Sequence, residues 1–100
     1  MTAYIIAEVE VTDPEIADKY RVLARKAVAE HGGRYVVRNE IPVMLEGDWG
    51  DGKRLVVLSF DDMNRARDWY NSDAYAKALQ YGRVSMIRRI ALVPGAADAS

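Results

Sequence analysis

The side chains of this sequence best suited to chemistry are a cluster of aromatic residues, one histidine, and charged residues isolated in apolar segments. Trp69, Tyr70 and Tyr75 fall within seven residues. Tryptophan and tyrosine bury a large ring and carry a polar tip that needs a hydrogen-bond partner. The cluster therefore predicts either a corner of the core or the wall of a cavity for a flat organic ligand.

Two residues are candidates for proton transfer. His31 is the single histidine, and imidazole has an ordinary pKa close to neutrality. It could act as a general acid or base or as an axial haem ligand, but at the end of a predicted helix it could equally cap carbonyl groups. We expect no haem or other cofactor. Glu46 could act as a base if an apolar cleft raised its pKa, or it could belong to a hairpin.

The candidates for ligand binding are Tyr20, Arg38, Trp49, Trp69 and Tyr75. Arg38 interrupts an apolar segment, and its guanidinium could hold a carboxylate through two hydrogen bonds. The alternative is an ion pair with Glu46, Glu8 or Glu10, because a buried arginine needs a partner. Tyr20 could donate a hydrogen bond into the cleft, and Trp49 could lie at its mouth. For each aromatic residue the alternative is packing in the core or against a second subunit.

Other polar residues have structural alternatives of their own. Arg88 and Arg89 alternate on the last predicted strand, so one of them must face the cleft or a partner subunit. The alternative is that they pair across a dimer with acidic residues such as Glu8 or Glu10. Ser72 lacks the Gly-x-Ser-x-Gly context of a hydrolytic nucleophile, so we interpret it as a helix cap.

Composition excludes several classes of function. The 14 basic and 15 acidic residues give a net charge of -1, which predicts no basic patch for nucleic acid. Without cysteine, and with one histidine, the chain has no thiolate chemistry and no multi-histidine metal site; we expect no metal. The first residues, MTAYIIAEVEV, lack a basic region and are too short and charged for a signal peptide or membrane span. The expected location is cytoplasmic.

Hydrophobic periodicity predicts the elements that position these side chains. The predicted strands are 3–11, 34–39, 54–60 and 85–93, with 43–46 as a continuation of the second strand or a separate short one. A helix should begin at Thr12 or Asp13 and end at the glycine pair that follows His31. A second should run from 61–62 to about Tyr70, with a third after 71–73 that ends at Gly82.

This order, β-α-β followed by β-α-β, predicts an α+β fold of the ferredoxin-like kind. The four strands form an antiparallel sheet with the helices on one face, in a single domain over 1–95 followed by a disordered tail, 96–100. Ile6, the run 55–58, and the region of Ile87, Ile90 and Leu92 cannot all be hidden under the helices. We therefore expect a homodimer that pairs through the sheet faces.

Four segments together carry a resemblance to a known family. They are residues 31–38 (HGGRYVVR), 45–49 (LEGDW), 54–57 (RLVV) and 66–75 (ARDWYNSDAY). The combination resembles the uncharacterised domain-of-unknown-function family numbered 1330, a member of the dimeric α/β-barrel superfamily. The resemblance implies a pair of ferredoxin-like subunits, each with a ligand cleft between sheet and helices. Characterised branches of that superfamily include cofactor-independent monooxygenases, muconolactone-isomerase-like enzymes and haem-degrading proteins.

The sequence thus predicts a small homodimeric protein that binds an anionic or aromatic organic molecule between its sheet and helices. Isolated polar residues within apolar segments are the usual composition of such a pocket. Two alternatives stay open. One is a non-enzymatic structural or interaction dimer, and the other is a cofactor-independent monooxygenase or isomerase. The sequence predicts no nucleic-acid or membrane partner.

Overall fold

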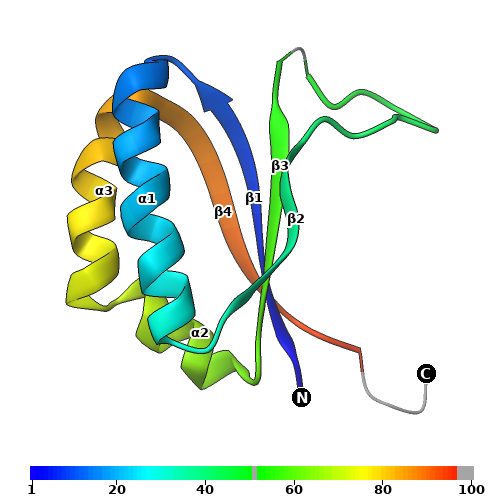
Figure 1. Ribbon diagram of the computed structural model, residues 1–100. Helices are drawn as coiled ribbons and strands as arrows, with labels where there is room; N and C mark the ends of the chain where they lie inside the picture. Colours follow the sequence, from blue (N-terminus) through cyan, green and yellow to red (C-terminus); the bar gives the residue numbers. More distant parts are fainter. Residues whose placement is uncertain (51, 97–100) are drawn as a thin grey trace.

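A four-stranded antiparallel sheet carries helices on one face and leaves the other face open (Figure 1). The computed structural model describes residues 1–50 and 52–96. The strands, which lie in the order β2-β3-β1-β4, are β1 (Ala3–Val11), β2 (Arg34–Glu40), β3 (Arg54–Phe60) and β4 (Met86–Pro94). The helices are α1 (Pro14–Glu30), α2 (Met63–Tyr70) and α3 (Asp73–Ser85).

The predicted ferredoxin-like topology is confirmed. α1 and α3 lie side by side across the sheet, and the short α2 lies at one end of it (Figure 1). None of the described helices is both long and apolar enough to cross a membrane. Of the tail predicted to be disordered, 97–100 lie outside the described residues.

Each helix begins at a side chain that accepts a hydrogen bond from the backbone of its first turn. Asp13 is the cap of α1, where its Oδ1 accepts from the Ile16 N–H at 3.2 Å. Asp62 caps α2 through the Arg65 N–H. Ser72 caps α3 through the Tyr75 N–H at 3.1 Å, as the sequence predicted. These caps satisfy backbone donors that a helix start leaves unpaired.

Two predicted boundaries were wrong. Gly82 does not end α3, which continues to Ser85 and passes directly into β4. A Cβ at Gly82 would lie 2.9 Å from Cδ1 of Tyr20, so glycine serves here as a place of close helix packing. Residues 43–46 form no strand, because β2 shifts register against β3 and Asn39 takes a left-handed φ of 52°.

The core lies between the helices and the sheet, and its largest fully buried side chains are Trp69, Tyr75 and Phe60. On β1, Ile5, Ala7 and Val9 face the helices. Pairing opposite them puts the side chains of β4 with even numbers from Met86 to Leu92 on the same face. Ile90 and Leu92 therefore pack against the covered core, and the large apolar side chains that β4 leaves open are those of Ile87 and Val93.

Candidate functional site

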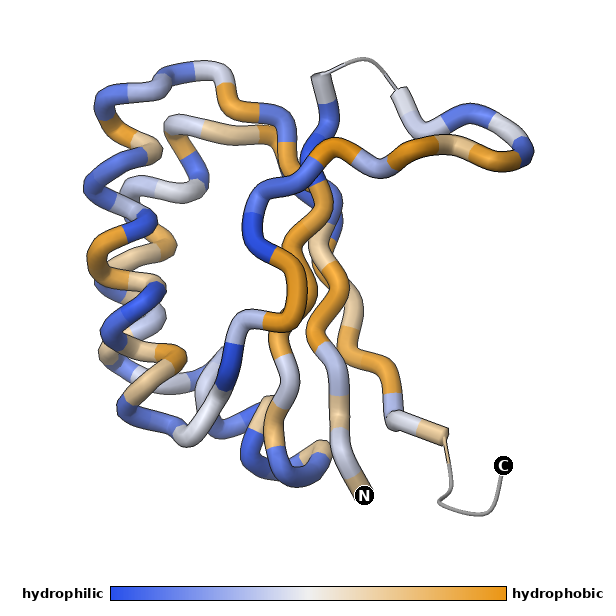
Figure 2. Tube along the Cα trace, turned by 45° about the vertical axis from the view of Figure 1, so that its right-hand side comes forward, coloured by the Kyte–Doolittle hydropathy of each residue, from blue (hydrophilic) through white to orange (hydrophobic). Residues whose placement is uncertain are grey.

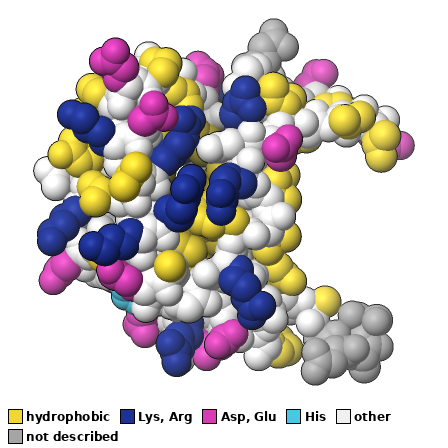
Figure 3. Space-filling view, viewed as in Figure 1, with side chains coloured by type: hydrophobic (Ala, Val, Ile, Leu, Met, Phe, Trp, Pro, Cys, Tyr) yellow, Lys and Arg dark blue, Asp and Glu magenta, His cyan; other side chains and the backbone are white. Residues whose placement is uncertain are grey.

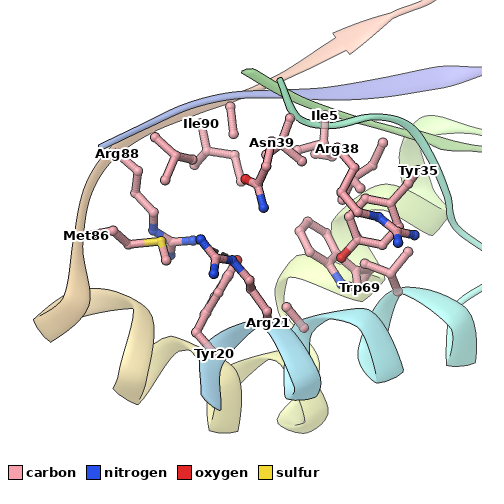
Figure 4. A pocket seen from close by; sticks show the side chains of 16 residues that line it. Ile5, Tyr20, Arg21, Tyr35, Arg38, Asn39, Trp69, Met86, Arg88 and Ile90 are labelled. Carbon is pink, nitrogen blue, oxygen red and sulfur yellow. Dashed lines mark hydrogen bonds between the residues drawn. The ribbon is translucent and has the colours of Figure 1, made fainter. Parts of the chain in front are cut away.

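A cavity of about 60 Å³ lies between α1 and the covered face of the sheet. Its walls are mostly apolar and include Ile5, Ala24, Val28 and Ile90. In Figure 4, Arg88 and Tyr20 lie toward one end of the cavity. Tyr35, Arg38 and Trp69 lie toward the other end. A single water needs roughly 10–15 Å³ of such space, so the cavity suits a compact molecule.

Arg88 organises the inner polar end of this cavity. Its Nη1 donates to the phenolic oxygens of Tyr20 and Tyr75, each at 2.9 Å. The two phenolic oxygens are themselves 2.9 Å apart. Three elements supply this cluster, because Tyr20 comes from α1, Tyr75 from the first turn of α3 and Arg88 from β4. We call these three residues the Arg88 cluster.

The electrostatics of the Arg88 cluster keep the phenol neutral and the guanidinium charged. Burial chiefly, with repulsion from Tyr75, raises the pKa of Tyr20 well above its ordinary value. Burial by itself would lower the pKa of Arg88, but the two phenolic oxygens outweigh it and the pKa lies above its ordinary value. Among the described residues, Arg88 forms no ion pair with a carboxylate. The charge is therefore held by neutral acceptors alone.

Two more arginines line the cavity. Arg21 forms an ion pair with Asp18 at 2.8 Å on the helix surface, and the exposed Arg38 lies over the ring of Tyr35 at 4.4 Å. Basic side chains gather on the face between α1 and β2, around a hollow with apolar walls (Figure 3). Asn39, held in its left-handed conformation, directs its side-chain amide toward the cavity (Figure 4).

The aromatic cluster forms a packed wall behind the cavity. Trp69 is 1% exposed, and its ring centroid lies 4.3 Å from that of Tyr75 and 5.5 Å from that of Phe60. Trp69 lines the cavity, and its indole N–H has no hydrogen-bond partner within residues 1–50 and 52–96. Tyr75 is 0% exposed and contributes only its hydroxyl to the polar end. The sequence left two alternatives for this cluster, a corner of the core or the wall of a cavity. In the structure Trp69 is both, because it is buried in the core and also lines the cavity.

The structure brings together some of the predicted site residues and separates others. Tyr20, Arg38 and Trp69 line the cavity, with Tyr75 in the Arg88 cluster. His31 lies beyond the end of α1, where its Nδ1 is 2.9 Å from the carbonyl oxygen of Ala27.

Glu46 and Trp49 lie on the segment between β2 and β3, away from the cavity. Glu46 is exposed. Trp49 donates from Nε1 to the carbonyl oxygen of Lys53 at 3.1 Å and lines a shallow hollow with Ile6 and Glu8 on the open face of the sheet. The structure therefore places neither residue at the polar end of the cavity.

Glu8 is one of the acidic residues that the sequence suggested as partners of the arginines across a dimer. In the structure it pairs with Arg89 within the same subunit. Its two oxygens contact Arg89 at 2.9 Å and Lys53 at 3.2 Å. The hydrogen bond from Arg89, followed by that from Lys53, lowers the pKa of Glu8. Because Arg88 and Arg89 alternate, Arg89 occupies the open face and leaves Arg88 in the cavity.

Sequence reasoning did not single out Arg21 or Asn39, and it left the direction of Arg88 undecided. Arg21 follows Tyr20 on α1, and Asn39 follows Arg38 on β2. Neither residue has a distinctive spacing. The useful signal for Arg88 was its alternation with Arg89, combined with the register that pairs it with Val9 on the covered face.

Comparison with solved structures defines the class of protein. The fold matches a protein of unknown function from Rhodopseudomonas palustris with a TM-score of 0.78 and 11% identity, over 96% of this chain and 83% of that chain. The cofactor-independent oxygenase SnoaB from Streptomyces nogalater matches with a TM-score of 0.68 and 11% identity, over 96% of this chain and 94% of SnoaB. Rv0793 from Mycobacterium tuberculosis matches with a TM-score of 0.65 and 12% identity, over 100% of both chains. The chain has the fold of the dimeric α/β-barrel proteins.

Within that class, the chain belongs to the family described as domain of unknown function DUF1330, which matches residues 2–96. The resemblance inferred from the four sequence segments is confirmed. A search of the curated proteins gives no significant match. At 11–12% identity, the likeness to the solved structures is one of fold.

Proposed function

We propose that this protein binds a compact anionic organic molecule in the cavity between α1 and the sheet. The observation that carries the proposal is the charge of the lining. Arg21, Arg38 and Arg88 line a mostly apolar cavity, and no described lining residue is a carboxylate. Arg88, which is partly buried and forms no ion pair with a described carboxylate, is the guanidinium best placed to bind a planar oxyanion through paired hydrogen bonds.

The lining supports binding ahead of proton transfer. It includes no histidine among the described residues, and the phenol of Tyr20, already protonated at neutral pH with an ordinary pKa, has its pKa raised further by burial. His31 and Glu46, the residues proposed for proton transfer, are positioned elsewhere in the subunit. The fold is shared with SnoaB, an oxygenase, but the cavity itself offers no described group that would be a base near pH 7.

Titration with small carboxylates tests the proposal. Arg88→Met keeps an unbranched, flexible side chain but removes the guanidinium and its charge, so the affinity for a bound carboxylate should fall at least tenfold, as expected when a hydrogen bond to a charged group is lost. Arg83→Met is the matched control, because Arg83 is exposed on α3. Thermal shift and calorimetry with benzoate and butyrate give the measurement. If no carboxylate binds the wild-type protein, or if both variants bind equally, the proposal fails.

We further propose that two copies associate through the open face of the sheet. On that face Ile6 is 39% exposed, Val93 39% and Ile87 64%. Isolated exposed apolar residues are ordinary, but Ile6 lies beside Val57 and Ala91 on this face, and grouped apolar residues on a sheet face indicate an interface. The dimeric α/β-barrel fold supports a second copy of this chain as the occupant.

A further inference from the structure

The hydrogens of the Arg88 cluster can be assigned by counting. A guanidinium only donates, so in both contacts Nη1 of Arg88 is the donor and the oxygens of Tyr20 and Tyr75 accept. The two phenols retain one hydrogen each. The contact between their oxygens at 2.9 Å uses one of these hydrogens, and the other is left without a partner in the cluster.

Burial decides which phenol keeps the unpaired hydrogen. Tyr75 is 0% exposed, and the described polar neighbours of its hydroxyl are Tyr20 and Arg88. A buried O–H without an acceptor is costly. Tyr75 therefore donates to Tyr20, and the hydrogen of Tyr20, a residue that lines the cavity, is available to a ligand.

The same counting shows that the groups of the Arg88 cluster that face the cavity present donors only. Arg88 retains the hydrogens of Nε and Nη2, because both of its contacts with the phenols are made by Nη1. The oxygen of Tyr20 already accepts from Arg88 and from Tyr75, which fills its acceptor capacity. The Tyr75 oxygen keeps one lone pair, but Tyr75 is 0% exposed, so a ligand group that needs to donate a hydrogen bond would reach no free acceptor in the Arg88 cluster.

We propose that the Arg88 cluster is a carboxylate subsite. The guanidinium of Arg88 and the hydroxyl of Tyr20 bind the carboxylate oxygens, and Tyr75 is a positioning residue that fixes the direction of the Tyr20 hydrogen. This inference rests on the proposed function and adds the head group of the ligand. A carboxylate only accepts, whereas a primary amide of the same shape also presents two donors.

Matched acid and amide pairs test the head group. We expect wild-type protein to bind benzoate and butyrate at least tenfold more tightly than benzamide and butyramide. Tyr20→Phe should reduce this acid-to-amide ratio by about tenfold, while Tyr81→Phe, a change on α3 at a residue outside the cavity lining, should leave it unchanged. Nuclear magnetic resonance titration of the Arg88 Nε–H signal reports binding at the cluster, and thermal melting shows that each variant is folded.

The positioning role is tested by removing the Tyr75 hydroxyl in two backgrounds. Tyr75→Phe should weaken benzoate binding about threefold in the wild-type background and should have no effect in the Tyr20→Phe background. A purely structural role would weaken binding equally in both. If no carboxylate binds wild-type protein, the proposed function fails. If benzoate binds and needs Arg88, but Tyr20→Phe preserves the acid-to-amide ratio or Tyr75→Phe is additive, this inference alone is overturned.

Discussion

Tyr20 is the residue in which burial and hydrogen bonding act most strongly on a single group. Desolvation, and then the neighbouring Tyr75, raise its pKa, while the charge of Arg88 acts in the opposite direction. The net rise means that the folded protein holds the phenolic proton more tightly than the unfolded chain does. In the folded state Tyr20 therefore remains a hydrogen-bond donor at pH values where an exposed tyrosine ionises.

This rise in pKa predicts a loss of stability in alkali. In the unfolded chain the phenol has a pKa of about 10, so the contribution of Tyr20 to stability is fully present below about pH 10. It is lost as the pH rises above that value, because the unfolded chain then releases a proton that the folded chain retains. Tyr20→Phe should make the free energy of unfolding fall less steeply between about pH 9 and pH 11.

Urea unfolding at a series of pH values measures this slope. Tyr81→Phe, which removes a phenol in another environment, provides the control. Equal slopes for wild-type protein and Tyr20→Phe would contradict the expected link between the burial of Tyr20 and its proton.

The two arginines considered for anion binding show how far single residues could be predicted. Arg38 was singled out because it breaks an apolar segment, and it does line the cavity, although it is exposed over Tyr35. For Arg88 the sequence left two directions open for the side chain, one toward the cleft and one toward a partner subunit. Its direction follows from the pairing of Arg88 with Val9, which depends on strand register and cannot be read from β4 alone.

Among the elements, α3 owes its path to a close approach to α1. Gly82 lies in the interior of α3 and is buried against the ring of Tyr20. The sequence predicted a helix end there, because glycine is common at helix ends. A glycine that permits close packing has the same local sequence signal, and only the neighbouring helix distinguishes the two cases.

Gly82→Ala should therefore destabilise the protein even though alanine favours helix. Helix propensity alone would stabilise by about 1 kcal/mol, but overpacking costs about 1–3 kcal/mol. A Cβ 2.9 Å from Cδ1 of Tyr20 must displace that ring. We expect a net loss of about 1 kcal/mol together with weaker benzoate binding. Gln80→Ala, at an exposed position of α3, is the control for helix propensity. A stabilised Gly82→Ala with wild-type binding would contradict this account.

The segment between β2 and β3 shows a second limit of prediction at this scale. Its apolar residues suggested a strand over 43–46, yet Val43 is 86% exposed and Leu45 is 92% exposed. The left-handed Asn39 and the register shifts of β2 direct this segment away from the sheet. Figure 2 shows it as a projecting arm with a hydrophobic stretch (Figure 2). A strand pattern requires a partner strand, and this segment has none within the described part of the subunit.

For the whole molecule, the apolar arm and the open sheet face present the same problem of uncovered surface. Both lie on the side of the sheet away from α1 and α3 (Figure 1). The predicted imbalance between sheet area and helix cover could be read from sequence because alternation assigns each strand residue to a face. The sequence did not show which β4 residues remain open, since Ile90 and Leu92 occupy the covered face. The sequence therefore predicted that apolar sheet surface would stay uncovered, but it did not predict which β4 residues would form that surface.

Ile6→Lys should dissociate the proposed dimer. Ile6 is on β1, an interior strand, where it lies opposite Val57 and Ala91 on the open face. An unpaired charge desolvated in an interface costs about 3 kcal/mol or more, which would weaken association at least a hundredfold.

Val22→Lys, at a position 69% exposed on α1, is the matched control and should remain dimeric. Sedimentation velocity over a hundredfold range of concentration, with thermal melting to verify folding, gives the measurement. A wild-type protein that sediments as a folded monomer throughout, or an Ile6→Lys variant that still sediments as a dimer, would show that the open face is not the interface.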